Sequence, residues 1–233
     1  MPADLPIVLV PGLGSSVRNH LPILPTLWRH GSLFVANQTR DDTIAAMASR
    51  VLSEAPERFS LIGHSLGGYI VLEMIRQQPK RIVRLALLNT SARPDTVEAT
   101  KLRNERVAET KAGRYAEVRA ASFPLSVHPD RVNDAALKEM SRLTGEDSGP
   151  DAFIRQQAAI IARIDSRPHL KDIRVPTLVL SGDQDMLISN EFSKEMAAMI
   201  PGAKLVIVPH CGHLAPVEQP RATAAALDEW LRT

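Results

Sequence analysis

Ser65 stands in the stretch GHSLG (63–67), with a glycine two positions away on either side. A serine hydroxyl is a weak nucleophile at neutral pH and attacks a carbonyl carbon only when a neighbouring base takes its proton. The apolar run FSLIG (59–63) precedes the serine and a helical pattern follows it, so the motif G-x-S-x-G lies in a strand–turn–helix context. That context favours an exposed nucleophile over a plain glycine-rich turn, which is the alternative.

The base that such a serine needs is expected at the same edge of the sheet. His213 lies in PHCGHLAP (209–216), directly after the apolar run KLVIV (204–208) and before the last helical pattern. A loop histidine bonded to the backbone is the alternative, but its position after a strand favours a base. We interpret the other six histidines as surface or loop residues, with His64 pointing away from its neighbour Ser65.

An acid that orients the histidine should also follow a strand. Asp183 and Asp185 come directly after the run TLVLSG (177–182), and the residues alone do not separate them; either could also be only a turn or cap residue. Backbone N–H groups must stabilise the oxyanion of the intermediate. We expect one from Leu66, the residue after the serine, and one from Leu13 in the glycine-rich loop VPGLGSS (10–16).

The elements that would position these groups can be read from hydrophobic patterning. Short and mostly continuous apolar runs are typical of strands buried on both faces of a parallel sheet. They occur at 7–10, 33–36, 59–63, 85–89, 177–182 and 204–208. Amphipathic helical patterns lie between them, around 44–52, 70–75, 192–200 and 224–231. This alternation predicts an α/β fold with a mostly parallel, doubly wound sheet.

One region breaks the alternation. Residues 94–170 contain no convincing strand, and 95–120, 131–144 and 150–164 are predicted to be helical. The run RNERVAETKAGR (103–114) has the pattern of a solvated helix face. Because open α/β sheets bind ligands at the carboxyl ends of their strands, we interpret 94–170 as a lid and not merely as extra packing. The sequence thus predicts a core of 1–93 and 171–233 with a helical cap of 94–170.

Composition narrows the classes of protein that remain. Lys and Arg number 28 against 26 Asp and Glu, a balance that does not favour nucleic acid or another polyanion as a partner. The single cysteine, Cys211, excludes an intrachain disulfide and a cysteine-rich zinc site. No signal-peptide pattern and no apolar stretch of about 18 residues is present, so we expect a cytoplasmic protein that does not enter a membrane.

Four segments, in this order, make the chain resemble the α/β-hydrolase superfamily: PGLGSS (11–16), GHSLGG (63–68), GDQD (182–185) and CGH (211–213). The family acid usually lies three residues after the glycine of a G-x-x-D turn, so the resemblance implies Asp185. It thereby implies Ser65, Asp185 and His213 as the catalytic triad, and Leu13 and Leu66 as oxyanion donors. It also implies that the helices of 94–170 form a cap.

The resemblance extends to small capped esterases, enol-lactonases and C–C bond hydrolases. The chain differs from the family in having Pro11–Gly12 in place of the common His–Gly and NQTRDD at 37–42, which changes the mouth of the pocket. Relatives that use an aspartate nucleophile are excluded by the serine at position 65.

The first hypothesis is a serine hydrolase that cleaves a small carboxylic ester, thioester or lactone without metal or organic cofactor, acting as a monomer or homodimer. The alternatives are a C–C bond hydrolase of aromatic degradation and a non-catalytic ligand-binding protein on the same fold. Met74, Met186 and Phe123 are open between lining an acyl pocket and packing in the core.

Overall fold

The computed structural model describes residues 5–233, in which six strands form one sheet with every pair parallel. The order across the sheet is β2-β1-β3-β4-β5-β6. The strands are β1 (Ile7–Val10), β2 (Leu33–Val35), β3 (Phe59–His64), β4 (Ile82–Leu88), β5 (Thr177–Gly182) and β6 (Lys204–Val208). Every residue of β1, β3 and β5 is buried, which explains the continuous apolar runs. The predicted parallel α/β sheet is confirmed.

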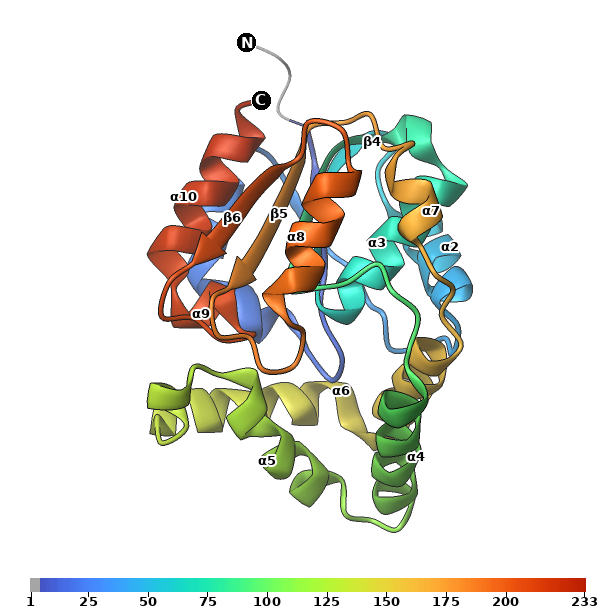
Figure 1. Ribbon diagram of the computed structural model, residues 1–233, viewed down its shortest axis with the longest axis vertical. Helices are drawn as coiled ribbons and strands as arrows, with labels where there is room; N and C mark the ends of the chain where they lie inside the picture. The colour runs from blue at the N-terminus through green and yellow to red at the C-terminus, as the bar shows by residue number, and fades with distance from the viewer. Residues whose placement is uncertain (1–4) are drawn as a thin grey trace.

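Helices cover both faces of the sheet, and alternate residues of each strand enter different cores. Val8 and Val10 of β1 belong to one apolar cluster and Ile7 and Leu9 to the other. The first cluster is completed by α2 (Ile44–Glu54), α3 (Leu66–Gln77), α7 (Arg167–Leu170) and α8 (Asn190–Met199). The second is completed by η1 (Val17–Ile23), α1 (Leu24–Trp28), α9 (Ala215–Glu218) and α10 (Pro220–Leu231). Figure 1 shows the sheet between α10 on one side and α3 and α8 on the other.

The remaining helices lie beyond the carboxyl ends of the strands, at the bottom of Figure 1. They are α4 (Val97–Lys111), α5 (Tyr115–Ser126), η3 (Pro129–Arg131) and α6 (Ala135–Ile161). The expected single helix over 95–120 is instead two, because the chain turns at Gly113 with a φ of 85°. The two helices expected at 131–144 and 150–164 are the halves of α6, which meet at a kink at Gly149 before Pro150.

The two ends of this helical segment are tied together. Asp95, just before α4, accepts from Arg163, just after α6, at 2.8 Å, and from Arg103 of α4 at 3.0 Å. Arg163 also donates to the backbone oxygen of Arg93 at 2.9 Å. The Asp95 and Arg163 side chains are nearly inaccessible to solvent, so the attraction between their charges is screened less than in a surface pair, and loss of one partner would leave a buried charge unpaired. It therefore fixes where the chain leaves the sheet and returns to it.

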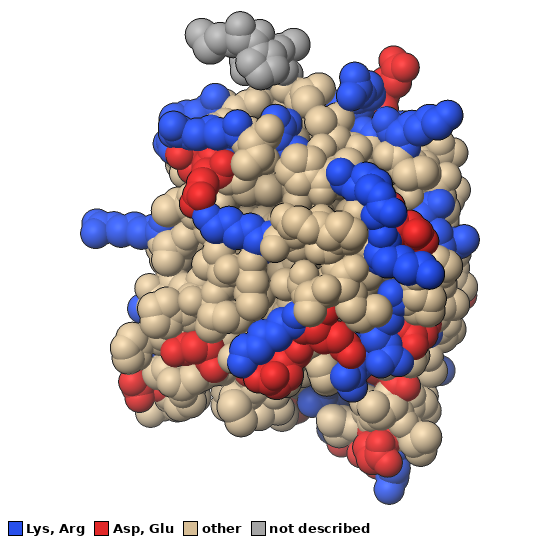
Figure 2. Space-filling model, turned by 45° about the horizontal axis from the view of Figure 1, so that its top comes forward, with Lys and Arg blue, Asp and Glu red and all other residues tan. Residues whose placement is uncertain are grey.

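The described surface is mixed in charge. On the face shown in Figure 2, acidic side chains lie beside basic ones, with uncharged residues between them, so the basic side chains form no unbroken surface there. Within residues 5–233, no helix has the length and apolar character needed to cross a membrane. A short segment, η2 (Pro79–Arg81), connects α3 to β4 at the amino end of the sheet.

Candidate active site

Ser65 occupies the turn between β3 and α3 with a backbone conformation that is rare for a side-chain-bearing residue. Its φ is 56° and its ψ is −118°. The turn is held by a hydrogen bond from the Ser65 N–H to the oxygen of Leu88 at 2.9 Å, and by one from the Thr90 hydroxyl to the Ser65 oxygen at 2.8 Å. A Cβ at Gly67 would lie 2.0 Å from the oxygen of Val10, so only glycine allows α3 to begin this close to β1. The surrounding contacts thus hold a strained serine at the edge of the sheet.

The structure brings Ser65, His213 and Asp185 together in one hydrogen-bonded series. Nε2 of His213 lies 2.8 Å from Oγ of Ser65, and Nδ1 lies 2.8 Å from Oδ2 of Asp185. A carboxylate can only accept, so Nδ1 carries the proton and Nε2 is left to accept from the serine hydroxyl. Both His213 and Asp185 are less than one-tenth exposed. The three residues come from the loops after β3, β5 and β6, at the carboxyl edge of the sheet.

Asp185 is held as a charged acceptor. Its Oδ1 accepts from the backbone N–H groups of Leu187 and Ile188 at 3.0 and 2.9 Å, and its Oδ2 also accepts from the Asn89 amide at 3.0 Å. Burial alone would raise the pKa of this carboxyl, but attraction to His213 and the hydrogen bonds outweigh it, so the pKa lies below its ordinary value. Asn89 was not singled out in the sequence, because an asparagine ending a strand is a common turn residue.

Asp183, the other candidate acid, lies elsewhere. Its carboxylate accepts from the backbone N–H of Cys211 at 3.0 Å and so links the loop after β5 to the loop that carries His213. The sulfur of Cys211 is buried, and burial, with repulsion from Glu218 and Asp183, raises the pKa of its thiol far above the usual range. Cys211 is therefore a packing residue beside the site.

The interpretation of the remaining histidines as surface or loop residues is wrong for two of them: His20 lies in η1 and His64 in β3, and both are buried. His128 lies in the loop before η3 but is buried as well. His64 donates to the backbone oxygen of His213 at 3.0 Å, and its ring centroid lies 5.5 Å from that of His213 and 5.2 Å from that of His20. Burial, followed by repulsion from His20 and His213, places the pKa of His64 well below 6.5, and burial lowers the pKa of His20 to about 4. Both rings are therefore neutral at pH 7; His64 contacts the loop of His213, and His20 packs against His64.

The loop expected to supply an oxyanion donor lies against the serine. A Cβ at Gly12 would be 3.1 Å from the Cβ of Ser65, and Leu13 and Leu66 both line the cavity that contains Ser65. Leu66 is the first residue of α3, so its N–H has no acceptor within the helix.

Two glutamines fix the shape of this loop. Gln38 donates to the backbone oxygens of Gly12 and Ser15, both at 3.1 Å, and Gln156 of α6 accepts from the N–H of Gly14 at 2.8 Å. The segment 37–42 and the helical segment therefore both position the loop after β1. Sequence reasoning missed this, since both glutamines act across long chain separations.

Glu218, in α9, holds the loop that carries His213. Its carboxylate accepts three backbone N–H groups: those of Gly212 and Leu214, on either side of His213, both at 3.1 Å, and that of His128, after α5, at 2.6 Å. Burial raises the pKa of Glu218 although these hydrogen bonds oppose the shift. Glu218 thus joins the His213 loop to the helical segment.

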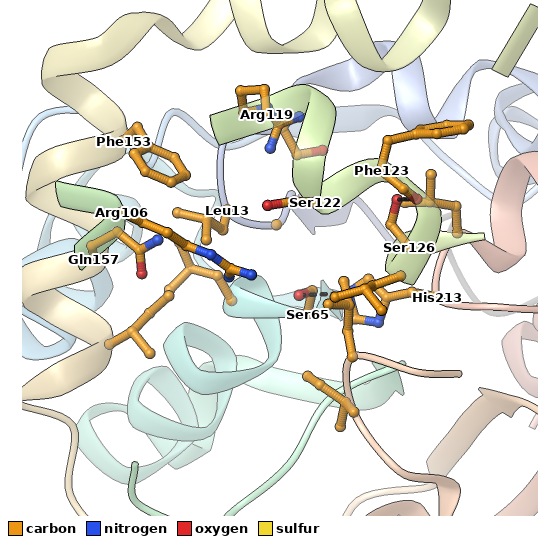
Figure 3. A pocket seen from close by; sticks show the side chains of 18 of the residues that line it. Leu13, Ser65, Arg106, Arg119, Ser122, Phe123, Ser126, Phe153, Gln157 and His213 are labelled. Carbon is orange, nitrogen blue, oxygen red and sulfur yellow. Dashed lines mark hydrogen bonds between the residues drawn. The ribbon is translucent and has the colours of Figure 1, made fainter. Parts of the chain in front are cut away.

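The site opens into a cavity of about 310 Å³ between the strand ends and the helices α4–α6 (Figure 3). Phe123 and Met186 line it, whereas Met74 is packed in the core. Arg103, Arg106 and Arg119 line it as well. The run 103–114 is therefore not simply a solvated face. A charged helix looks the same in sequence whether its arginines face water or a polar cavity.

The sheet is parallel and carries a strained serine after β3. This serine is hydrogen-bonded to a histidine after β6, which is hydrogen-bonded to an aspartate after β5. Fold and arrangement together are those of the α/β hydrolases. A family model described as "Alpha/beta hydrolase family" matches residues 7–226. The chain belongs to this family.

Two relatives are each 27% identical to this chain. One is a pimeloyl-[acyl-carrier protein] methyl ester esterase from Aromatoleum aromaticum, matched over 96% of this chain and 91% of its own length. Another is a putative carbamate hydrolase, RutD, from Shigella flexneri, matched over 97% and 91%. Among solved structures, an esterase from Thermogutta terrifontis is 26% identical with a TM-score of 0.87, covering 98% of this chain and 89% of that one. An enol-lactonase from Burkholderia xenovorans LB400, 23% identical with a TM-score of 0.89 over 98% and 92%, supports the fold alone.

Proposed function

We propose that this α/β hydrolase cleaves a small carboxylic ester, thioester or lactone through an acyl-enzyme on Ser65. The observation that carries the proposal is the continuous hydrogen-bonded series from Ser65 through His213 to Asp185, with both links at 2.8 Å. The esterase relatives at 26–27% identity support the same class of reaction.

In the first half of the reaction, Oγ of Ser65 attacks the substrate carbonyl while Nε2 of His213 takes the hydroxyl proton. Asp185 keeps the imidazole in the tautomer that can accept this proton and stabilises the imidazolium that results. The low pKa of Asp185 keeps it ionised throughout. His213 then donates its proton to the leaving oxygen or sulfur, the bond from carbon to that atom breaks, and the acyl group remains on Ser65.

The tetrahedral intermediate carries a negative charge on the former carbonyl oxygen. We assign its stabilisation to the backbone N–H groups of Leu13 and Leu66, two residues that line the cavity together with Ser65. Donors of this kind contribute about 3 kcal/mol each to transition-state binding in related sites. The anchoring of the loop by Gln38 and Gln156 keeps the first donor in place.

In the second half, water takes the place of the leaving group. His213, neutral again, removes a proton from the water as the water attacks the acyl carbon. The tetrahedral intermediate then collapses, the bond to Oγ of Ser65 breaks, and His213 returns the proton to the serine. The carboxylic acid product leaves and the free enzyme is restored.

We further propose that residues 94–170 act as the cap of the site, over a core of 1–93 and 171–233. The support is their position: α4, α5 and α6 lie beyond the strand ends, and their side chains complete the wall of the cavity that contains Ser65. A wall of this kind separates the acyl group from bulk solvent and selects among acyl groups.

The proposal is tested by steady-state kinetics on a matched panel: p-nitrophenyl butyrate, the corresponding thioester, a five-membered lactone and an aryl carbamate. The wild type should hydrolyse at least one ester, thioester or lactone, and Ser65→Ala should reduce kcat by about 10⁴ or more. Activity that survives Ser65→Ala, or turnover of the carbamate alone, would contradict it.

A further inference from the structure

The cavity beside Ser65 carries positive charge with no negative charge to balance it. Its lining includes three arginines, and within the described residues it includes no aspartate or glutamate. Arg103 pairs with Asp95, at 3.0 Å from Nε, and shares this carboxylate with Arg163. Arg106 and Arg119 form no ion pair within residues 5–233. Among the residues that the structure describes, the lining thus has two guanidinium groups with no carboxylate paired to them.

Arg119 is the more confined of the two. Its guanidinium lies between the loop after β1 and α6: a Cβ at Gly14 would be 2.9 Å from Nη1, and one at Gly145 would be 3.1 Å from Nε. Its Nε is buried with no acceptor in the part of the chain that the structure describes. Burial lowers the pKa of Arg119, yet a guanidinium stays protonated in proteins, so the cost of burying this charge is not avoided by loss of the proton.

Arg106 reaches the same cavity from α4. Figure 3 shows its side chain extending toward Ser65, with the Arg119 guanidinium above Ser122. Burial, with repulsion from Arg103, lowers the pKa of Arg106, and Glu109 opposes this only in part. Arg106 thus brings a second guanidinium, with no ion pair in the described residues, to the lining of this cavity.

Neutral donors point to the same kind of ligand. Gln157 is fully buried, and its Oε1 accepts from Arg103 at 2.9 Å. Its Nε2 has no partner within residues 5–233, although Gln157 lines the cavity. A buried donor without an acceptor is costly in a native protein, and a ligand oxygen would satisfy it. The Ser122 hydroxyl lies in the same lining but donates to the backbone oxygen of Val118 at 2.9 Å, so the Gln157 amide is the neutral donor that the arginines share the cavity with.

We propose that the substrate carries a carboxylate besides its scissile carbonyl, and that Arg106 and Arg119, with the Gln157 amide, bind this carboxylate. Guanidinium groups bind carboxylates through paired hydrogen bonds, which fixes both distance and orientation. A volume of about 310 Å³ suits a short dicarboxylic acid with one carboxyl esterified, or a lactone that bears a carboxylate. This inference rests on the proposed function, because it names the substrate class for the same cavity.

Two esters of equal chain length test it. Mono-p-nitrophenyl glutarate ends in a carboxylate, and p-nitrophenyl pentanoate ends in a methyl group at the same position. For the wild type, kcat/KM should favour the glutarate by about tenfold or more. The ratio should fall toward one in Arg106→Gln and in Arg119→Gln, and Arg106→Lys, which keeps the charge, should recover part of it.

The matched control is Arg142→Gln, which removes the same charge from α6 at an exposed site where Arg142 pairs with Glu139 and Glu146. This control should keep the wild-type ratio. A wild-type ratio of one or less would overturn the proposal, and so would an equal fall of the ratio in Arg142→Gln.

Binding separates this inference from the proposed function. Isothermal titration of Ser65→Ala with glutarate should give a Kd that rises at least tenfold when Arg106→Gln or Arg119→Gln is added. If no ester is hydrolysed but this dependence is found, the proposed function fails and the carboxylate site stands. If esters are hydrolysed and neither arginine substitution changes the Kd for glutarate, the carboxylate site fails and the proposed function stands. Inorganic phosphate that binds as tightly as glutarate would also overturn the assignment to a carboxylate.

Discussion

The side-chain amide of Asn89 donates a 3.0 Å hydrogen bond to Oδ2 of Asp185, the same oxygen that faces Nδ1 of His213. Asn89 is itself held in a left-handed conformation, with a φ of 47°, at the end of β4, and it also donates to the oxygen of Gly212 at 3.2 Å. One buried amide therefore joins the aspartate to the loop of the histidine. Asn89 acts through Asp185 and His213 and is a positioning residue.

Asn89→Gly removes this amide and tolerates the positive φ. We expect kcat to fall about tenfold with KM within twofold of the wild type, because the carboxylate loses one of its orienting bonds. Asp185 stays ionised at neutral pH even with a higher pKa, so the loss should be uniform between pH 6 and pH 9. Steady-state pH profiles measure this, with Asn133→Gly at an exposed position as control. An unchanged kcat would show that the other hydrogen bonds suffice.

The carboxylate of Glu218 links the His213 loop to the helical segment, and a change of one atom in it should break this link. Glu218→Gln replaces one of two accepting oxygens with a donor that faces backbone N–H groups. We expect a loss of stability of about 2 kcal/mol and a fall in kcat of about tenfold, since a buried N–H is left unsatisfied beside His213.

The control for Glu218 is Glu229→Gln, which makes the same chemical change on the surface of α10, where Glu229 pairs with Lys204. Urea unfolding and kcat are measured on both variants. Equal behaviour of the two would mean that the loop of His213 is held by its other contacts.

The ion pairs at the ends of the helical segment predict a dependence of stability on pH. Burial acts to raise the pKa of Asp95, but the guanidinium groups of Arg163 and Arg103 outweigh it, so the pKa lies below 3.8 in the folded protein. The carboxylate therefore contributes stability above pH 3.8, and this contribution is lost as the pH falls through the folded-state pKa.

Asp95→Asn should lower the free energy of unfolding at pH 7 by about 2 kcal/mol, and the difference from the wild type should narrow as the pH falls below 3.8. Urea titrations between pH 3 and pH 7 measure it. Glu139→Gln, at an exposed pair on α6, should show no measurable change. A difference between wild type and Asp95→Asn that stays constant with pH would contradict an ionic contribution.

The close approach of α3 to β1 predicts a sharp contrast between two glycines. Gly67→Ala should lower the free energy of unfolding by more than about 3 kcal/mol, because its Cβ would overlap the oxygen of Val10 and push the start of α3 away. A Cβ at Gly113 meets no atom within 4 Å, so Gly113→Asn, which tolerates a positive φ, should cost about 1 kcal/mol or less. Chemical denaturation of both variants decides between a packing constraint and a general cost of losing glycine.

The sheet could be predicted from the sequence because the strands β1, β3 and β5 are buried on both faces, and all six strands occur as separate apolar runs. Ser65 and His213 could be placed together because each follows such a run, and parallel strands end at one edge. The runs alone left Asp183 and Asp185 open, and the family resemblance implied Asp185. His64 was misinterpreted for a related reason. His64 is the last residue of β3 and is buried with the rest of that strand, whereas a histidine considered without its neighbours is expected to be exposed to solvent.

The wall of the cavity could not be predicted in the same way. Arg106 and Arg119 lie on helices whose sequences are rich in charge, and nothing local distinguishes an arginine that faces a cavity from one that faces water. Gln156 and Gln157 are uncharged and follow no motif, yet both are fully buried. Their roles depend on contacts with residues more than 50 positions away, such as Gly14 and Arg103. Only the packing of α4, α5 and α6 over the strand ends reveals them.

The central claim is that Ser65 is activated by His213, and covalent labelling tests it without knowledge of the substrate. A fluorophosphonate is incubated with the wild type, Ser65→Ala and His213→Ala, and the intact masses are recorded over time. We predict one adduct on the wild type, none on Ser65→Ala and a labelling rate reduced by several orders of magnitude in His213→Ala. Adducts that persist in Ser65→Ala, or a wild type that is folded yet unlabelled, would contradict the account.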